Sequence, residues 1–427
     1  MHKAKLVSSS PLQALPSTAE MTTLPNGLTV ITETVKTVRS VSVGLWVGTG
    51  SRDESAELNG ISHFIEHMVF KGTKKRDYIE ISKSLERVGG YLNAYTSKEQ
   101  TCFYARVLDE YVRVAVDVLA DLVFNPTFPD EELEKEKDVI IEEIKSIEDT
   151  PDELISDEFD ELFYPNHPLG LPIAGTPKTV RAFTRAAVQE YLSEAYTTNK
   201  MLLVAAGNVS HKAMLALAEK YIPKRRQGNG RLRQAYLHET YRPFVKEKVK
   251  PISQAHIMLG FPMARNDETY YAAHLLNMVL GGGMSSRLNL ELREKQGLAY
   301  TVFSSLHHYD ETNMLSIYMG TDYEKVSQSI QSIRRELDKL TEKTVPAKEL
   351  ELAKAQLKGG VIMAQESMSS RISHIARDMY YFGRILSSDE IIERIDAVMP
   401  KDLRAVAETV FDERLGSMLT YLPKKRK

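Results

Sequence analysis

The sequence predicts an α+β protein made of two similar domains, each with about 200 residues. The first half contains both segments with strand periodicity and segments with helix periodicity. Short motifs of the first half recur in the second half at a nearly constant offset. The chain has 427 residues, of which 42% are hydrophobic and 26% charged, an ordinary composition for a globular protein long enough for two domains.

The internal repeat is weak at each place but keeps the same order. The matching pairs are Leu85–Leu92 with Leu292–Ala299 at an offset of 207, Pro129–Leu133 with Pro346–Leu350 at 217, and Met201-Leu202 with Met418-Leu419 at 217. An ancient duplication explains this order. We expect a mobile tail at residues 1–20, an N-terminal domain at 21–222, a linker at 223–245 and a C-terminal domain at 246–427.

The N-terminal domain contains strand and helix patterns in a definite order. We expect a hairpin within Thr22–Ile31 around Pro25-Asn26-Gly27, a half-buried strand at Val41–Val47, a helix over Gly60–Phe70, a helix at Ile79–Val88, paired strands at Tyr91–Thr96 and Thr101–Val107, helices at Tyr111–Phe124 and Pro129–Glu148, and a strand at Met201–Ala206.

The helix expected over Gly60–Phe70 carries the residues with the clearest chemistry. His63 and His67 are four positions apart, so they lie side by side on one face and can hold a divalent metal. Glu66 lies near that face and is a candidate general base. Asn59 is a candidate N-terminal cap. The order H-x-x-E-H is the inverzincin signature, although the pentapeptide alone is also compatible with two incidental histidines on an ordinary helix.

A catalytic zinc usually has three protein ligands, so a third must come from elsewhere in the chain. Glu136 and Glu143 lie two turns apart on one face of the expected helix Pro129–Glu148. Glu142 is an adjacent carboxylate, and any one glutamate of this helix is also compatible with a solvated surface. Shifted by 217, Glu136 and Glu143 fall on Ala353 and Gly360, and the second half has no H-x-x-E-H near His274. The sequence thus predicts one metal site per chain.

Charge and composition exclude several classes of partner. The net charge of −3 favours neither nucleic acid nor an acidic membrane surface. No segment approaches the length of a membrane-spanning helix. Cys102 is the single cysteine, which we interpret as a buried, inert thiol. Residues 1–20 lack the apolar segment of a secretory signal, so a cytoplasmic location is the default expectation.

An acidic segment follows the expected Glu136/Glu143 helix. Its carboxylates are Glu148, Asp149, Asp152, Glu153, Asp157, Glu158, Asp160 and Glu161. Such a segment is usually a solvated face. Because it follows the candidate ligand helix, it also suggests attraction of basic peptides.

The chain resembles the pitrilysin and mitochondrial-processing-peptidase family, and in particular its short bacterial members related to the processing-peptidase β subunit. The resemblance covers roughly residues 21–423. The segments that carry it are His63-Phe64-Ile65-Glu66-His67, Gly89-Gly90 with Asn93-Ala94-Tyr95-Thr96-Ser97, Glu136 with Glu143, and Leu292-Arg293-Glu294-Lys295-Gln296-Gly297-Leu298-Ala299-Tyr300.

The resemblance implies a role for each of these residues. His63, His67 and Glu143 would bind Zn²⁺, and Glu136 would orient a ligand. Glu66 would be the general base. Arg293 and Tyr300 would contact the substrate carbonyl opposite the metal, and Asn93, Ala94 and Tyr95 would form an edge strand that binds substrate.

Arg293 is also compatible with a helix-surface charge, and Tyr300 with a core aromatic. Gly281-Gly282-Gly283 is either a flexible lip near the substrate or a helix C-terminal turn, and His256 we interpret as strand packing.

The function expected from the resemblance is zinc-dependent hydrolysis of short or unfolded peptides, including basic, presequence-like ones, between two sheet-and-helix domains arranged as a clamshell. The alternative is a non-catalytic structural or binding subunit of a processing-peptidase-like complex. A homodimer is expected, because a half-length chain must still enclose its substrate, and a heterodimer with a related chain is the other possibility.

Overall fold

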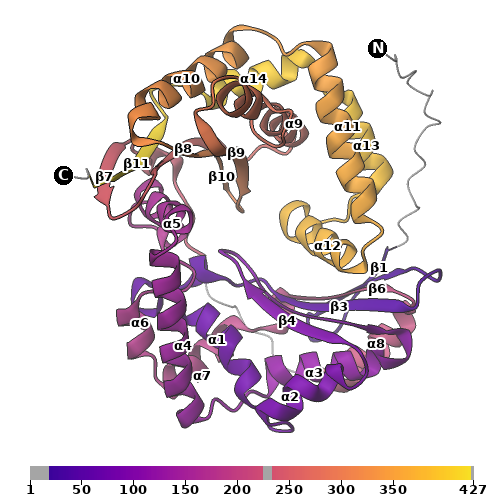
Figure 1. Cartoon of the computed structure of the whole chain (residues 1–427). Helices are drawn as coiled ribbons and strands as arrows, with labels where there is room; N and C mark the ends of the chain where they lie inside the picture. The colour runs from indigo at the N-terminus through magenta and orange to yellow at the C-terminus, as the bar shows by residue number, and fades with distance from the viewer. Residues whose placement is uncertain (1–18, 225–232, 425–427) are drawn as a thin grey trace.

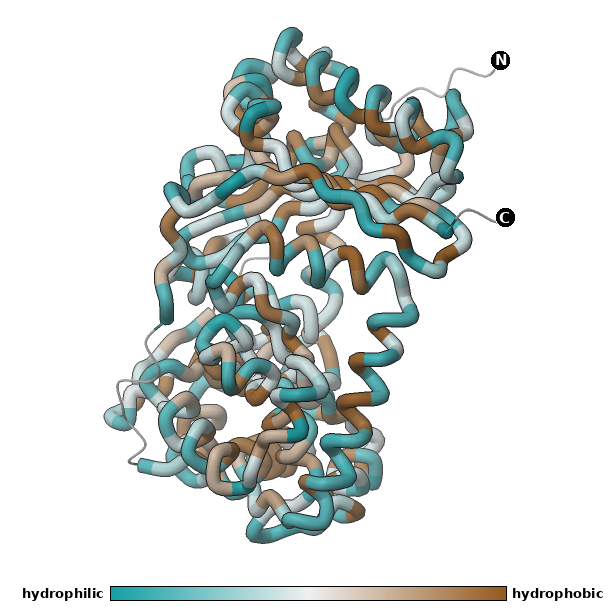
Figure 2. The backbone as a smooth tube through the Cα atoms, turned by 90° about the vertical axis from the view of Figure 1, so that its left-hand side faces the viewer, coloured by the Kyte–Doolittle hydropathy of each residue, from teal (hydrophilic) through white to brown (hydrophobic). Residues whose placement is uncertain are grey.

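The computed structural model describes residues 19–224 and 233–424. Figure 1 shows two halves, each with one sheet and its covering helices. Figure 2, a side view, shows the same two halves one above the other, with apolar stretches along the strands and along the inner faces of helices. The predicted α+β clamshell of two similar domains is confirmed.

The N-terminal sheet has the strand order β1-β2-β6-β3-β5-β4. Its strands are β1 (Ala19–Thr23), β2 (Thr29–Thr34), β3 (Ser40–Val47), β4 (Tyr91–Thr96), β5 (Thr101–Leu108) and β6 (Met201–Gly207). All neighbours are antiparallel except β2 and β6, which are parallel. The expected hairpin around Gly27 and the expected β4–β5 pair are both present, and β4 lies at an edge of the sheet.

The C-terminal sheet repeats this plan with the order β7-β11-β8-β10-β9. Its strands are β7 (Val245–Lys250), β8 (Ala255–Ala264), β9 (Ala299–His308), β10 (Thr312–Thr321) and β11 (Ser417–Pro423). Only β7 and β11 are parallel neighbours. In this sheet β9 lies at the edge that corresponds to the β4 edge of the N-terminal sheet.

Most helices cover one face of the sheet in their own half, and two pack on the sheet of the other half. In the N-terminal half they are α1 (Ile61–Met68), α2 (Tyr78–Glu86), α3 (Val112–Phe124), α4 (Asp130–Glu148), α5 (Pro151–Phe163), α6 (Pro177–Ala182), α7 (Arg185–Ala195) and α8 (His211–Tyr221). In the C-terminal half they are α9 (Tyr270–Leu280), α10 (Val326–Glu342), α11 (Ala347–Ala364), α12 (Met368–Phe382), α13 (Ser388–Ala397) and α14 (Pro400–Val410). A π-helical turn at Asn289–Lys295 precedes β9.

The second face of each sheet is covered by a helix from the opposite half. Helix α12 packs on β3 and β6 of the N-terminal sheet, where Ile372 and Ile375 lie against Trp46 and Val204. Helix α5 packs on β8 and β11 of the C-terminal sheet. Figure 1 shows α5 beside the C-terminal strands and α12 lying over β3 and β6. For this reason the strand predicted to be half-buried, Val41–Val47, is buried on both faces.

Buried ion pairs also join the two halves. Glu33 of β2 pairs with Arg371 of α12 at 2.5 Å, and both side chains are 6% exposed. The guanidinium of Arg52 is fully buried and pairs with Glu99 of its own half and with Glu311 of the other half. Because these charges are removed from water, each depends on its partner.

Replacing Arg371 by methionine should destabilise the protein by about 3–5 kcal/mol, because Glu33 would remain buried without a counter-charge. Urea denaturation followed by circular dichroism would measure the change. The double variant Glu33→Gln/Arg371→Met should recover most of the loss. Arg384→Met, which breaks an exposed pair with Glu390, is the matched control and should change the unfolding midpoint much less. An unchanged midpoint for Arg371→Met would contradict this account.

Some details differ from the sequence expectations or lie beyond the described residues. Of the expected tail, residues 1–18 lie outside the described residues, whereas Ala19 and Glu20 belong to β1. The expected linker is described only in part, and there Tyr236 and Tyr241 are buried against α5 and the C-terminal sheet. The boundaries between tail, domains and linker stay a prediction. Among the described residues, no helix is both long and apolar enough to cross a membrane.

Candidate metal centre

The N-terminus of helix α1 is formed by a glycine and is capped by a buried carboxylate. Gly60 is the N-cap residue, with φ of 92°, and a side chain there would meet the backbone of Ala174 and Gly175. Glu54 accepts hydrogen bonds from the backbone N–H groups of Gly60 at 2.7 Å and Ser62 at 2.8 Å. A negative charge at this end of a helix is favourable. The expected cap, Asn59, is wrong: its side chain instead donates to Glu54 and to the Pro172 carbonyl.

Burial of the apolar face of α1 determines where the polar side chains of this helix lie. Ile61, Phe64, Ile65 and Met68 are fully buried in the N-terminal core. The helix packs against α4 and β4, so its polar side chains meet the side chains of those two elements. Glu54 itself is buried, which raises its pKa to about 7 despite the backbone hydrogen bonds from Ser62 and Gly60.

Three side chains converge as a possible ligand set. One ligand atom each from His63, His67 and Glu143 lies within 4.8 Å of the others. Each histidine Nε2 is 3.7 Å from one oxygen of Glu143. That separation is too long for a hydrogen bond but close to the roughly 3.4 Å edge of a tetrahedron with metal–ligand bonds of about 2.1 Å. The donor set of two imidazoles and one carboxylate, with space between them, therefore fits zinc. In contrast, Glu142 pairs with Lys145 and is 71% exposed.

Glu136 fixes the orientation of His67. Its Oε1 lies 2.9 Å from His67 Nδ1, and its other oxygen pairs with Lys71 at 2.7 Å. With the proton on Nδ1, the lone pair of His67 Nε2 points toward Glu143 and can bind a metal. Burial lowers the pKa of His67, but the hydrogen bond and charge of Glu136 outweigh burial and leave that pKa above its usual value. Burial raises the pKa of Glu136, and the hydrogen bonds from His67 and Lys71 bring it below normal.

His63 is the more deeply buried of the two histidines. Burial and the neighbouring His67 lower its pKa to about 4, so the ring is neutral at pH 7 and its nitrogen lone pair is free. Its Nδ1 has no hydrogen-bond partner among residues 19–224 and 233–424. A neutral ring is the form that binds a metal.

Glu66 lies beside the ligand set without belonging to it. Its carboxylate accepts a hydrogen bond of 2.6 Å from the Thr96 hydroxyl. Burial raises the pKa of Glu66, and the bond from Thr96 opposes that shift. A carboxylate with a raised pKa, held by one hydrogen bond and close enough to interact electrostatically with His67 and Glu143, has the chemistry of a general base.

The strand that carries Thr96 has a free edge. Within the described sheet, β4 pairs only with β5. Ala94 and Thr96 lie on the face toward α1, while Tyr91, Asn93 and Tyr95 lie on the opposite, more exposed face. The Asn93 side-chain oxygen accepts a hydrogen bond from the backbone N–H of Ala94 at 2.9 Å. The Ala94 N–H would have to release the Asn93 side chain before it could bond to an added strand.

Arg293 and Tyr300 are close to each other but not joined to the ligand set. The Arg293 guanidinium lies 5.6 Å from the centre of the Tyr300 ring, and Tyr300 is 81% exposed. No hydrogen bond or ion pair of the described residues links either side chain to the three candidate ligands. The interpretation of Tyr300 as a core aromatic is therefore wrong.

Two other sequence interpretations can be judged from local contacts. Gly281 ends helix α9, and its N–H donates to the Asn277 carbonyl, as in a helix C-terminal turn. His256 lies in β8, and its Nδ1 is 2.8 Å from the Tyr318 hydroxyl, which agrees with strand packing.

The sequence reasoning did not identify Glu54, Lys71 or Thr96 as supports of the site. Thr96 lay within the quoted edge-strand segment, so that a contact with α1 could have been suspected. Glu54 lies in an irregular segment eight positions before Ser62 and gave no capping signal.

Comparison with known proteins agrees with this fold. Residues 29–177 match the family described as insulinase, peptidase family M16, and residues 182–357 match the peptidase M16 inactive domain. The chain is 41% identical to the "uncharacterized zinc protease YmxG" of Bacillus subtilis, over 92% of this chain and 95% of that protein. It is 37% identical to an uncharacterized zinc protease of Streptomyces coelicolor, over 93% of this chain and 88% of that protein.

Solved structures with low sequence identity share the fold. A protease from Helicobacter pylori is 22% identical, with a TM-score of 0.87, over 95% of this chain and all of that one. A structure from Pseudomonas fluorescens described as a peptidase M16 inactive domain is 20% identical, with a TM-score of 0.88, over 96% of this chain and 99% of that one. From the two matched domains and the relatives above 30% identity, we conclude that this chain is a member of peptidase family M16, the insulinase and pitrilysin family.

Proposed function

We propose that the protein is a zinc metalloendopeptidase that hydrolyses short or unfolded peptides. The observation that carries the proposal is the convergence of His63, His67 and Glu143 next to the separately held Glu66. The relatives named as zinc proteases support the same activity. The neutral His63 ring and the His67 ring oriented by Glu136 are both suited to bind zinc. We propose one zinc ion per chain.

Each residue of the candidate site has a defined role in this reaction. Zinc held by the three ligands would polarise the scissile carbonyl and lower the pKa of a coordinated water toward about 7. Glu66 accepts the proton of the attacking water and passes it to the leaving amine. Thr96 holds the Glu66 carboxylate in place, and Glu136 keeps the His67 ring in one orientation.

The substrate proposed for this site is an extended peptide. A peptide that pairs with the free edge of β4 gains main-chain hydrogen bonds without any requirement on its sequence. Such a strand would pass Thr96 and so bring a peptide bond close to Glu66. Most strands of a folded domain are already paired or have protected edges, which is why short or unfolded peptides are preferred.

Arg293 and Tyr300 support a pairing of two chains. Within the described part of a single chain, no hydrogen bond or ion pair joins the exposed Tyr300 or its neighbour Arg293 to the three candidate ligands. In the proposed homodimer, or in a heterodimer with a related chain, one subunit would present this pair to the peptide carbonyl in the other. There the two side chains would stabilise the developing oxyanion.

The acidic segment supports a preference for basic peptides, although part of it is neutralised internally. Glu158 pairs with Lys248 and Lys250, and Asp160 with Lys98. Asp157 is half-buried, and its partial burial raises the pKa of its carboxyl group.

Changing Asp157 and Asp160 to asparagine should lower kcat/KM for a basic peptide about three- to tenfold, because the attraction lost at the two positions together is worth about 1 kcal/mol. An acidic peptide of the same length should be cleaved as before or faster. The control is Asp338→Asn/Glu342→Gln, which removes the same charge from exposed positions of α10, outside the acidic segment. Equal effects on basic and acidic peptides, or no effect on either, would contradict the proposed preference.

The proposed activity is tested with a quenched fluorescent basic peptide and the full-length chain. Cleavage should disappear after treatment with a chelator and return when one equivalent of zinc is added. Cleavage that persists in a sample free of metal would overturn the zinc mechanism. A purified chain that neither binds zinc nor cleaves peptides would instead favour the non-catalytic subunit.

A further inference from the structure

The C-terminal half contains a counterpart of the metal site that has lost its ligands. Helix α9 packs against α11 just as α1 packs against α4. The burial pattern of Phe64–Val69 matches that of Leu275–Leu280, which sets an offset of 211 positions between the two helices. At this offset His63 corresponds to His274, Glu66 to Asn277 and His67 to Met278, and the repeat in α4 and α11 places Gly360 where Glu143 stands.

The counterpart cannot bind a metal in the same way. One imidazole remains, but a thioether and a glycine stand where the second imidazole and the carboxylate would be. The remaining nitrogen is also engaged, because His274 Nε2 lies 3.1 Å from His308 Nε2. Burial and the neighbouring His308 lower the pKa of His274 to about 3, so this ring is uncharged at neutral pH.

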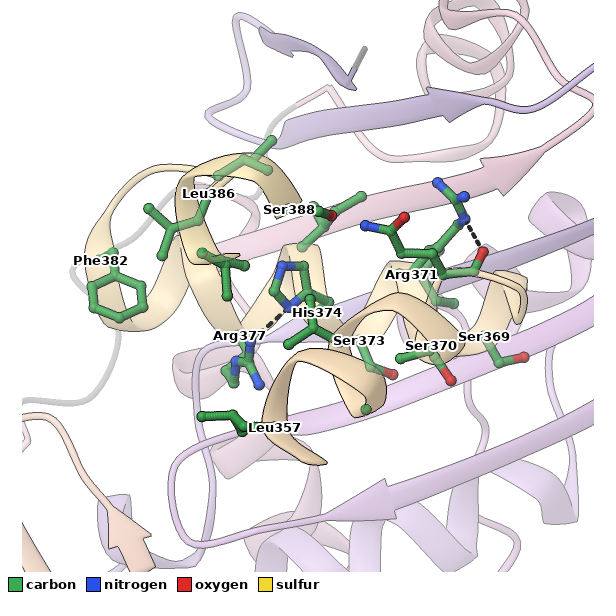
Figure 3. Close-up of a pocket in the computed structure, with 18 of the residues that line it drawn as sticks. Leu357, Ser369, Ser370, Arg371, Ser373, His374, Arg377, Phe382, Leu386 and Ser388 are labelled. Carbon is green, nitrogen blue, oxygen red and sulfur yellow. Dashed lines mark hydrogen bonds between the residues drawn. The ribbon is translucent and has the colours of Figure 1, made fainter. Parts of the chain in front are cut away.

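A cavity of about 680 Å³ occupies this part of the molecule. One wall is formed by α9 and α11, with Met278, Leu357 and Val361, and another by α12. Figure 3 shows α12 in the pocket, with Ser369, Ser370 and Arg371 toward one end and Phe382 toward the other. Its size falls in the range of about 300–1,000 Å³ that is usual for ligand pockets.

The cavity exists because Gly360 of α11 has no side chain and because helix α12 does not pack its apolar face on α11. Apart from the chain neighbours of Gly360 and the backbone of its own helix, no atom of the described residues lies within 4 Å of where a Cβ at Gly360 would be. The apolar side chains of Leu357 and Val361 are only half-buried there. Helix α12 packs by its apolar face on β3 and β6 of the other half, so that face does not cover α11.

The far side of the cavity reaches the edge strand proposed to bind substrate. Trp46, Tyr95 and Tyr104 of the N-terminal sheet line it, and the Trp46 ring N–H donates to the Tyr95 hydroxyl at 3.1 Å. Tyr95 immediately precedes Thr96, which holds Glu66, but its side chain lies on the opposite face of β4. Alternate side chains of a strand paired with β4 would therefore point toward the cavity and away from the metal ligands.

We propose that this metal-free counterpart of the zinc site is a pocket that binds large apolar side chains of the peptide substrate, some distance from the scissile bond. The assignment rests on the proposed peptidase function and specifies its substrate class: extended peptides with an apolar segment. Burial of Leu or Phe side chains against the aromatic and aliphatic walls drives binding. The polar rim, with Gln356, Ser373 and the His374–Arg377 pair at 2.6 Å, offers groups for the peptide backbone.

Two adjacent glycines of α11 provide a matched pair of variants. Gly360→Phe places a ring in the open space of the cavity, while Gly359→Phe makes the same change one residue away, outside the cavity lining. Both replace a glycine inside a helix, which removes a helix-destabilising residue. Gly360→Ala and Gly360→Leu complete a series of increasing volume, and circular dichroism checks that every variant is folded.

Binding is measured by fluorescence anisotropy in the Glu66→Gln background, with two labelled peptides that differ only in a Phe-Leu-Phe or a Ser-Gly-Ser segment. The apolar peptide should bind at least about tenfold more tightly than the polar one, an easily measured difference. Gly360→Phe should remove this preference, Gly360→Leu should weaken it, and Gly359→Phe should leave it intact. Equal binding of the two peptides, or a preference that survives Gly360→Phe, would overturn the pocket.

The same measurement on chelator-treated protein separates this inference from the proposed activity. The pocket contains no metal ligand, so the apolar preference and its loss in Gly360→Phe should persist without zinc. A chain that shows this pattern but cleaves no peptide would support the pocket and contradict the peptidase. A chain that cleaves both peptides with equal kcat/KM, and binds them equally, would support the peptidase and contradict the pocket.

Discussion

Replacing Glu66 by glutamine should abolish peptide cleavage while zinc stays bound. The variant keeps the size of the side chain and its hydrogen bond to Thr96, but an amide cannot accept the proton of the attacking water. Because proton transfer by a positioned group contributes about 10²–10⁴-fold, kcat should fall by at least that factor. The measurement is kcat on a quenched peptide, together with zinc content by elemental analysis.

Two controls give this result its meaning. Thr96→Val removes only the hydrogen bond that holds the carboxylate, so its loss of kcat should be smaller than that of Glu66→Gln. A conservative change outside the site, His256→Gln in β8, should leave kcat unchanged. If Glu66→Gln cleaves peptides at the wild-type rate with zinc bound, Glu66 is not the base.

Replacing His67 by alanine should eliminate tight zinc binding. The change removes one of three protein ligands and also the partner of Glu136, so the remaining two ligands no longer close the site. Glu136→Gln should have the intermediate effect of a supporting group, about 10–100-fold weaker zinc affinity. Competition with a zinc-binding dye measures both affinities.

His256→Ala serves as the matched control for the loss of a partly buried histidine, because its ring nitrogen contacts Tyr318 and no candidate ligand. It should bind zinc like the wild type. Unchanged zinc affinity in His67→Ala would remove His67 from the ligand set, and an equal loss in His256→Ala would point to an indirect effect on folding.

Local patterns together with the family resemblance were sufficient to predict the three candidate ligands and Glu66, but not the supporting residues Glu54, Lys71 and Thr96. The spacing of His63, Glu66 and His67 is a property of one helix, and Glu143 was indicated by its place on another helix and by the family resemblance. The structure brings His63, His67 and Glu143 within reach of one ion. The roles of these residues stay predictions until metal and activity are measured.

Long-range contacts could not be predicted from local patterns. Nothing in the period of Val41–Val47 shows that α12, more than 300 positions later, covers its second face. The acidic segment was interpreted as a solvated face with a possible attraction for basic peptides, yet Glu158 within it binds two lysines of β7. The fully buried Arg52 pairs with Glu311 of the other half. The two residues are far apart in the sequence, so no local pattern predicts this pair.

The duplication was visible in the sequence, whereas its consequence for the C-terminal half was not. The shift of Glu143 onto Gly360 predicted only that the second half lacks a metal site. The cavity beside Gly360 also requires the displacement of α12 onto the N-terminal sheet, which is a feature of the assembled fold.

Anomalous diffraction at the zinc absorption edge, on crystals of the Glu66→Gln chain grown with one equivalent of zinc, tests the central claim most directly. We expect one anomalous peak per chain, about 2.0–2.2 Å from His63 Nε2, His67 Nε2 and one oxygen of Glu143. A peak bound by other residues, or no peak in a crystal soaked with excess zinc, would contradict the assignment of this site as the metal centre.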